Sequence, residues 1–242
     1  MVMNANITHN EQRRDVALKA GIRKRFVQVS VTLAVQATIL FLAAGKLNWM
    51  WAWLYVGIYL VGVVINAAFM LRYSPETIAE RAETRGKAWD KVIGGLGALM
   101  YFVLLLVVAG LDVRFGWTGR IALVLHIAGA VAFVLGGALF SWAMISNAYF
   151  STVVRIQEER GRAVCTTGPY RFVRHPGYVG MIIQSLTLPL MLGSLWALIP
   201  GGLTALLMVV RTVLEDRTLH KELDGYRDYA RWVRYRLLPG MW

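Results

Sequence analysis

The chain has 242 residues, of which 57% are hydrophobic and 17% are charged, whereas roughly a quarter of the residues in soluble globular domains are charged. Lys and Arg number 26 and Asp and Glu number 14, so the formal net charge is +12. A basic excess suits a nucleic-acid-binding protein or a membrane protein with basic loops, and the apolar composition with its 9 Trp argues against nucleic acid as a partner and favours the membrane.

Five long segments of the chain lack Asp, Glu, Lys and Arg altogether, at residues 26–45, 47–71, 92–111, 121–154 and 178–210. A helix that spans a bilayer needs about 20 predominantly apolar residues. The first three segments therefore predict one spanning helix each, and the fourth predicts a span over about residues 121–143 that continues beyond the membrane surface. So many apolar segments exclude a soluble, a disordered or a disulfide-stapled protein.

The fifth segment is too long for one perpendicular helix, and Pro189, Gly193 and a Pro-Gly-Gly sequence interrupt it. Proline removes a backbone donor and glycine loosens a helix. We therefore expect a hairpin of two helices, about 178–192 and 195–214, each a full or a partial span. The predicted fold is an all-α integral membrane protein with four transmembrane helices plus this helical hairpin, about six membrane segments in all.

The basic residues fall on alternate connections between these segments. The N-terminal 25 residues, residues 72–91, 155–177 and 211–242 together contain 23 Lys and Arg, and the other connections contain only Lys46, Arg114 and Arg120. Basic residues concentrate on the cytosolic side of membrane proteins. We expect a multi-pass integral membrane protein, in the cytoplasmic membrane if the source is bacterial, with both termini in the cytosol and the hairpin returning the chain to its starting side.

Two polar stretches flank the hairpin on this predicted cytosolic side. Residues 166–178 contain two Tyr, two Arg, one His, two Gly and two Pro. Headgroup anchoring explains aromatic and Arg residues at helix ends, but it does not require so irregular a backbone. In the second stretch, Arg211 and Glu215 share a helix face, as an ordinary ion pair or as part of a site, and Asp216 adds another acid at the membrane boundary. Together the stretches suit a cofactor that carries an adenine, a ribose and both signs of charge.

The joint pattern of these stretches resembles the integral-membrane methyltransferases. It consists of Gly-Pro-Tyr-Arg-Phe-Val-Arg-His-Pro-Gly-Tyr-Val-Gly (168–180), the apolar hairpin, Arg-x-x-x-Glu-Asp (211–216) and Tyr226-x-x-Tyr229. The families concerned are the isoprenylcysteine carboxyl methyltransferases and the related phospholipid N-methyltransferases, and the resemblance covers about residues 150–240. It implies S-adenosylmethionine as the methyl donor, bound on the cytosolic side, and a lipophilic acceptor that reaches the site from the bilayer.

The resemblance divides the chain into a basic N-terminus (1–25), four transmembrane helices (26–149) and a cofactor-binding region (150–242) that includes the hairpin and the tail. It implies cofactor contacts from Gln157, Val164, Cys165, Tyr170, His175, Pro176, Gly177, Tyr178 and Glu215. Arg211 matches an Arg linked to the acceptor, so Arg211 and Glu215 are the candidate catalytic residues. Asp216 stands where the family more usually has a second Glu.

Each of these side chains has an expected role. Glu215 would hold the ammonium group of the cofactor, Tyr170 and Tyr178 would face its sulfonium, and His175 would bond its carboxylate or ribose. Arg211 would orient a carboxylate on the acceptor; if the acceptor is an amine or a thiol, Arg211 would instead pair with Glu215 and be structural.

The remaining polar residues leave several alternatives open. The single Cys and the spacing of the His residues predict no metal site. His126 is expected to be packed or hydrogen-bonded, and Asn66, Gln36 and Gln184 either line an acceptor channel or join helices. The tail from Tyr226 to Trp242 could be a lid over the cofactor or a surface-bound helix.

Three functional classes compete at this stage. Methyl transfer to a prenylated cysteine carboxylate comes first, with a phospholipid amine or a small lipophilic thiol as other acceptors. A transporter or interaction protein would explain the membrane spans but not the two polar stretches. A sterol reductase that uses NADPH would share a related C-terminal fold, but this chain is short for one.

Overall fold

The computed structural model describes residues 2–73, 75, 78, 87–147, 149–150 and 163–242, with the side chains described from residue 16 onward. These residues form helices and connecting turns, and no strand occurs among them. Five of the helices are long and apolar enough to cross a membrane, and a sixth apolar helix is shorter. The predicted all-α membrane fold with four spans plus a hairpin is therefore confirmed.

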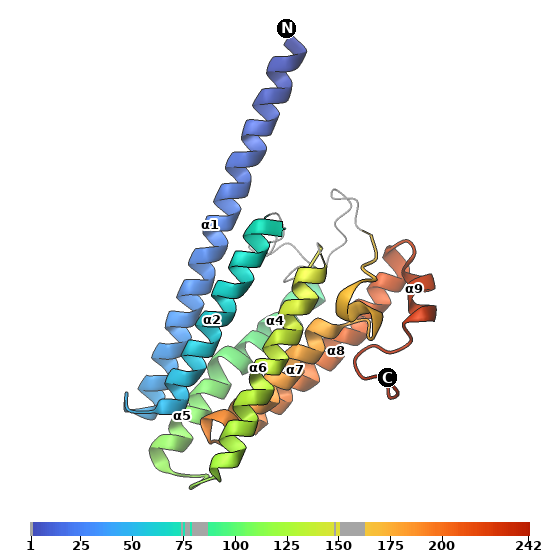
Figure 1. Ribbon diagram of the computed structural model, residues 1–242. Helices are drawn as coiled ribbons and strands as arrows, with labels where there is room; N and C mark the ends of the chain where they lie inside the picture. Colours follow the sequence, from blue (N-terminus) through green and yellow to red (C-terminus); the bar gives the residue numbers. More distant parts are fainter. Residues whose placement is uncertain (1, 74, 76–77, 79–86, 148, 151–162) are drawn as a thin grey trace.

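The helices follow the predicted segments closely. They are α1 (Val2–Ala44), α2 (Met50–Tyr73), α4 (Ala88–Leu99), α5 (Leu105–Phe115), α6 (Leu123–Ser146), α7 (Pro176–Leu192), α8 (Leu198–Glu222) and α9 (Tyr226–Trp232). A π-helical turn, Met100–Leu104, joins α4 to α5, so these two form the continuous span that the sequence predicts. Figure 1 shows the first turns of α1 extending beyond the other helices.

The hairpin turns where the sequence predicts a break. Gly193 ends α7 in a left-handed conformation with φ +84°, and its N–H donates to the carbonyls of Pro189 and Leu190. A side chain on Gly193 would also collide with the imidazole of His126, 2.5 Å from the position of a Cβ. The second helix begins at Leu198 rather than near residue 195, and it continues to Glu222, well past residue 214. The longer α8 carries the second polar stretch on a rigid element.

Glycines bring α6 and α7 into close contact. A Cβ on Gly180 would lie 2.5 Å from the carbonyl oxygen of Gly136, and a Cβ on Gly129 would lie 2.6 Å from the backbone of Met191. Small residues allow membrane helices to approach closely, because packing rather than water exclusion holds them together. The contact fixes where the first polar stretch enters α7.

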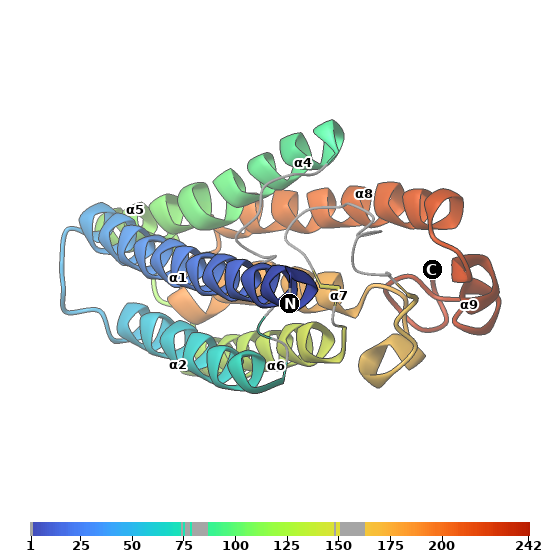
Figure 2. The same ribbon diagram turned by 90° about the horizontal axis from the view of Figure 1, so that it is seen from above.

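The membrane bundle and the tail have separate apolar cores. The larger core lies toward the hairpin turn and includes Leu40, Tyr55, Leu105 and Leu188. A smaller one joins the end of α8 to α9. Away from the hairpin turn, the C-terminal ends of α2, α6 and α8 lie on the same side of the bundle as the N-terminal ends of α4 and α7 (Figure 1). Seen from above, α4 and α8 lie on one side, and α2 and α6 lie on the other (Figure 2). This is the side that the sequence predicts to be cytosolic.

Candidate cofactor and acceptor site

One large cavity occupies this half of the molecule. Its volume is about 1680 Å³, which exceeds the roughly 300–1,000 Å³ of a typical small-molecule pocket. At one end it is lined by polar and aromatic groups, among them Tyr170, His175 and Tyr178. At the other it is lined by apolar side chains of the membrane-spanning helices, such as Val61 and Phe133. A single space therefore joins a polar site to the region that the bilayer surrounds.

The backbone of the first polar stretch depends on its Gly and Pro residues. Gly168 has φ +58°, and a Cβ there would lie 2.2 Å from the hydroxyl of Ser146. A 3-10 turn, Gly168–Arg171, follows, and Pro176 opens α7 at a position where a missing N–H costs nothing. Tyr170 is buried under this turn, and burial raises the pKa of its phenol above the ordinary range. Its hydroxyl is therefore a neutral group that accepts a hydrogen bond from Asn147.

The tail packs directly against this stretch. The backbone N–H groups of Arg174 and His175 donate to the carbonyls of Tyr235 and Arg236, at 2.9 and 3.0 Å. The hydroxyl of Tyr229 donates to the carbonyl of Tyr170 at 2.7 Å. The tail from Tyr226 onward is thus a wall of the polar stretch rather than a helix lying separately on the membrane surface.

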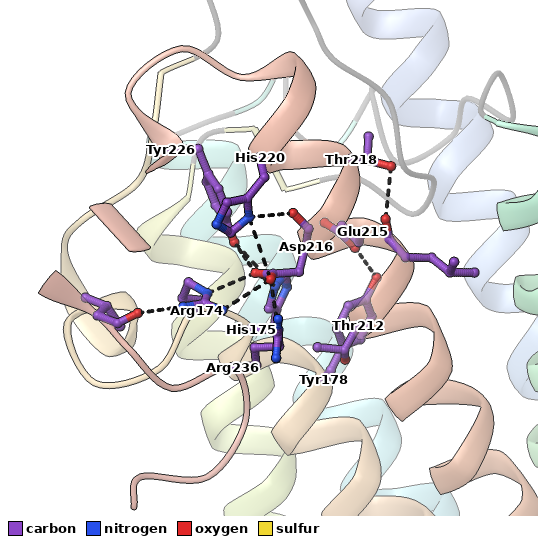
Figure 3. A network of polar contacts seen from close by, with 12 residues as sticks. Arg174, His175, Tyr178, Thr212, Glu215, Asp216, Thr218, His220, Tyr226 and Arg236 are labelled. Atoms are coloured by element: carbon purple, nitrogen blue, oxygen red, sulfur yellow. Dashed lines mark hydrogen bonds and ion pairs between the residues drawn. The ribbon is translucent and has the colours of Figure 1, made fainter. Parts of the chain in front are cut away.

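Asp216 is the centre of a buried polar network (Figure 3). Its carboxylate accepts from Arg174 at 2.9 and 3.2 Å, from Arg236 at 2.8 Å, from the Tyr226 hydroxyl at 2.9 Å and from His175 at 3.3 Å. The carboxylate is 1% exposed. Burial and the neighbouring Asp216 carboxylate raise the pKa of Tyr226, so its phenol stays a donor. Asp216 therefore ties the first polar stretch, α8 and the tail together.

Glu215 points away from this network, toward Tyr178 (Figure 3). The Tyr178 hydroxyl donates to the Glu215 carboxylate. On its other sides, the Tyr178 ring stacks on His175, with 5.8 Å between ring centroids, and lies 5.5 Å from the guanidinium carbon of Arg211. The structure thus brings together four of the side chains that the sequence singles out.

Arg211 has a partner that the sequence does not predict. Its Nε and Nη2 donate to the two carboxylate oxygens of Asp90 at 2.7 and 3.1 Å. Both side chains are buried, at 8% and 1% exposed. The sequence offers Glu215 as an alternative partner of Arg211, and the structure pairs Arg211 with an acid 121 residues away. The only local signal for Asp90 is that it is an acid two residues before a long apolar segment.

Residues 127–221 match the isoprenylcysteine carboxyl methyltransferase family. The match begins in α6, runs through both polar stretches and the hairpin, and ends in α8. The chain is thus similar to this family over 95 of its 242 residues. No curated protein matches the chain significantly. The helices are those of a multi-pass membrane protein, and the matched segment supports membrane methyltransferase chemistry.

The other predicted site residues have varied surroundings. Val164 and Cys165 line the cavity, as does Gly177, where a Cβ would lie 3.1 Å from the ring of Phe150. Pro176 starts the helix instead of lining the cavity. Gln157 lies outside the described residues. The match excludes Asp90, Tyr226, Tyr229 and Arg236, which the fold brings to the site from outside the family segment.

Polar residues within the membrane mostly join helices. His126 Nδ1 lies 2.8 Å from the carbonyl of Met191, and its ring stacks on Trp51, so the expected packed histidine is confirmed. Asn66 bonds Ser141 across α2 and α6 at 2.8 Å, and Tyr55 donates to Gln36. Gln184 and Asn66 also line the cavity. In the described part of the chain, no group of three His, Cys, Asp or Glu could hold a metal ion.

Proposed function

We propose that this protein transfers a methyl group from S-adenosylmethionine to a lipophilic acceptor that enters from the bilayer. The observation that carries the proposal is the cavity, which is continuous from Tyr178, Glu215 and His175 to the apolar residues of the spanning helices. A soluble methyltransferase has no need of such a shape. An acceptor with a long apolar part would place that part among the helices and its reacting end beside the polar groups.

The polar end of the cavity fits the chemistry of S-adenosylmethionine. Glu215 supplies a carboxylate for an ammonium group, and the faces of Tyr178 and Tyr170 suit a sulfonium. His175 and Arg174, which both bond Asp216, line the side of this end where a carboxylate or ribose would lie. Val164, Leu219 and Leu223 offer an apolar wall for an adenine. We assign the cofactor contacts to these side chains, with Cys165, Gly177 and Gln157 as further contacts and Pro176 as the start of the helix that presents them.

Methyl transfer of this kind depends mainly on the alignment of the acceptor with the methyl group and the sulfur of the donor. When bound, S-adenosylmethionine supplies an electrophilic methyl group on a sulfur that leaves as a neutral thioether, so no acid is needed to expel it. Glu215, Tyr178 and His175 bind and orient the donor, and α8 holds Glu215 and Arg211 one turn apart. Good positioning of two reactants can supply about 7–11 kcal/mol of the barrier. The tail and the spanning helices exclude water from the reacting atoms.

Arg211 orients the reacting end of the acceptor. A prenylated cysteine carboxylate is the first candidate, because a guanidinium recognises a carboxylate well. A phospholipid amine and a small lipophilic thiol are the alternatives, since both have an apolar part that suits the same cavity. Incubating membrane extract with labelled S-adenosylmethionine and identifying the labelled product by mass spectrometry separates the three.

Binding of the methyl donor is the first test. Purified protein in detergent should bind labelled S-adenosylmethionine saturably and should not bind NADPH. The variants His175→Ala and Glu215→Gln should lose most of this affinity, whereas Glu222→Gln, on the same helix and at the surface with Lys87, should keep it. Wild-type protein without saturable binding would overturn the function, and full affinity in both site variants would overturn the site.

We also propose that the cavity's polar end faces the cytosol, as the distribution of basic residues predicts. A membrane-impermeant thiol reagent applied to intact cells should label Trp117→Cys, in the turn before α6. It should not label Asp224→Cys, in the turn before α9, until the membrane is opened. The reverse labelling pattern would invert the topology.

A further inference from the structure

We propose that Asp90 is a positioning residue for methyl transfer, which acts by fixing the guanidinium of Arg211 at the point where the acceptor meets the methyl donor. This inference rests on the proposed function and adds to it a residue that lies outside the family segment 127–221. Asp90 comes from the first turn of α4, and Arg211 from the middle of α8.

The geometry of the pair leaves Arg211 one orientation. The two oxygens of Asp90 take Nε and Nη2, at 2.7 and 3.1 Å, which is a two-point contact with a planar group. The guanidinium carbon also lies 5.5 Å from the centre of the Tyr178 ring. A single contact would let the long Arg side chain swing, whereas a carboxylate on one edge and a ring on one face hold it.

The pair lies along the wall of the cavity. Asp90, Arg211, Tyr178 and Glu215 all line it. Tyr178 joins the pair to the cofactor residues, because it donates to Glu215. Beyond Asp90 along α4, the cavity wall is made of Gly94, Gly97 and Ala98, which are small and apolar. Asp90 thus holds Arg211 between the polar end of the cavity and the apolar end.

Stability alone is a weak reason for such a pair. Burying two charges costs several kcal/mol in desolvation, and apolar residues of similar size often stabilise a protein equally well. The position of Asp90 in the first turn of α4 favours a negative charge, because backbone N–H groups are unpaired there. The Asp90 carboxylate is therefore better explained by its effect on the reaction: it fixes the orientation of Arg211 at the cavity.

The experiment separates donor binding from methyl transfer. Full-length protein in detergent is tested with labelled S-adenosylmethionine and three acceptors that share one chain: S-farnesyl-N-acetylcysteine, farnesylthiol and farnesylamine. The acceptor that wild type methylates fastest is used for all variants. Asp90→Asn should keep donor affinity within about twofold and should lower kcat/KM for that acceptor by about 10- to 100-fold, the range expected for a lost hydrogen bond to a charged group.

A matched control is available at the other end of the same span. Asp112 in α5 is 2% exposed and accepts hydrogen bonds from Ser194 and Thr118. Asp112→Asn also neutralises a buried carboxylate, but it lies far from the cavity's polar end. Its kcat/KM should therefore match that of wild type once the folded fraction is equal. A fall in kcat/KM in Asp112→Asn equal to that in Asp90→Asn would show a general structural effect and would overturn the proposal.

A double mutant tests whether Asp90 acts through Arg211. Arg211→Lys keeps the charge but cannot make the two-point contact, so it should show the same loss of about 10- to 100-fold as Asp90→Asn. It also tests the proposal by itself if Asp90→Asn is too unstable to purify. Adding Asp90→Asn to Arg211→Lys should cause little further loss, because residues in one unit are not additive. Independent, multiplying losses would overturn the proposal. Wild-type protein that binds no donor would instead overturn the proposed function, so the two failures are distinct.

Discussion

The network around Asp216 makes a prediction about the tail. Asp216→Asn keeps the shape of the side chain, but it replaces one acceptor oxygen with an NH₂ group that faces the donors of Arg174 and Arg236. Arg236 is about one-third exposed and can turn to water. Arg174 is 7% exposed and would stay buried with its charge unpaired.

The free-energy cost of Asp216→Asn can be judged from the exposure of Arg174 and Arg236. Removing one partner of a buried ion pair costs about 3–5 kcal/mol. Arg174 also donates to the carbonyls of Val233 and Arg234, at 3.0 and 2.9 Å, and these contacts survive the substitution. We therefore expect the lower end of the range, about 3 kcal/mol, which raises the opening constant of the tail on the order of 100-fold.

Limited trypsin digestion of the detergent-solubilised protein measures this opening. The tail of Asp216→Asn should be cleaved at its Arg residues on the order of 100-fold faster than that of wild type, when cleavage follows the open population. Asp228→Asn is the control, since Asp228 pairs with Arg231 while both side chains are more than 70% exposed, and exposed pairs contribute little. Equal cleavage rates in wild type and Asp216→Asn would refute the reasoning that this carboxylate holds the tail.

Two further predictions concern packing and pH. Gly180→Ala places a methyl 2.5 Å from a backbone oxygen of α6. It should destabilise the bundle by about 1–3 kcal/mol and lower the apparent melting temperature. Gly202→Ala should leave the melting temperature unchanged, because no atom lies within 4 Å of its Cβ. Because the pKa of Tyr226 is raised in the folded state, its contribution should be constant below about pH 10, the ordinary pKa of a phenol, and should be lost as the pH rises further. Protection of the tail from proteolysis should then fall less steeply above pH 10 in Tyr226→Phe than in wild type, and parallel curves would contradict this.

The candidate site could be predicted in part, because its residues lie in two continuous stretches. Tyr170, His175 and Tyr178 share one stretch, and Arg211 and Glu215 another. The hairpin between them returns the chain, so that the Tyr178 hydroxyl reaches Glu215. The role of Asp216 could not be predicted, because neighbouring positions on a helix point about 100° apart and only the packing of α8 decides which acid faces which partner. Glu215 faces the cavity, and Asp216 faces the tail.

The sequence by itself determined the membrane spans and the hairpin, and it predicts the side on which the polar stretches lie. These depend on local quantities: the length of an apolar segment, the position of prolines and glycines such as Gly193, and the distribution of basic residues. Only the tertiary structure decided that Asp90 pairs with Arg211 and that Arg236 reaches Asp216. Those pairs join separate elements, and their formation depends on how each helix is rotated and how the tail folds back, which no local pattern specifies.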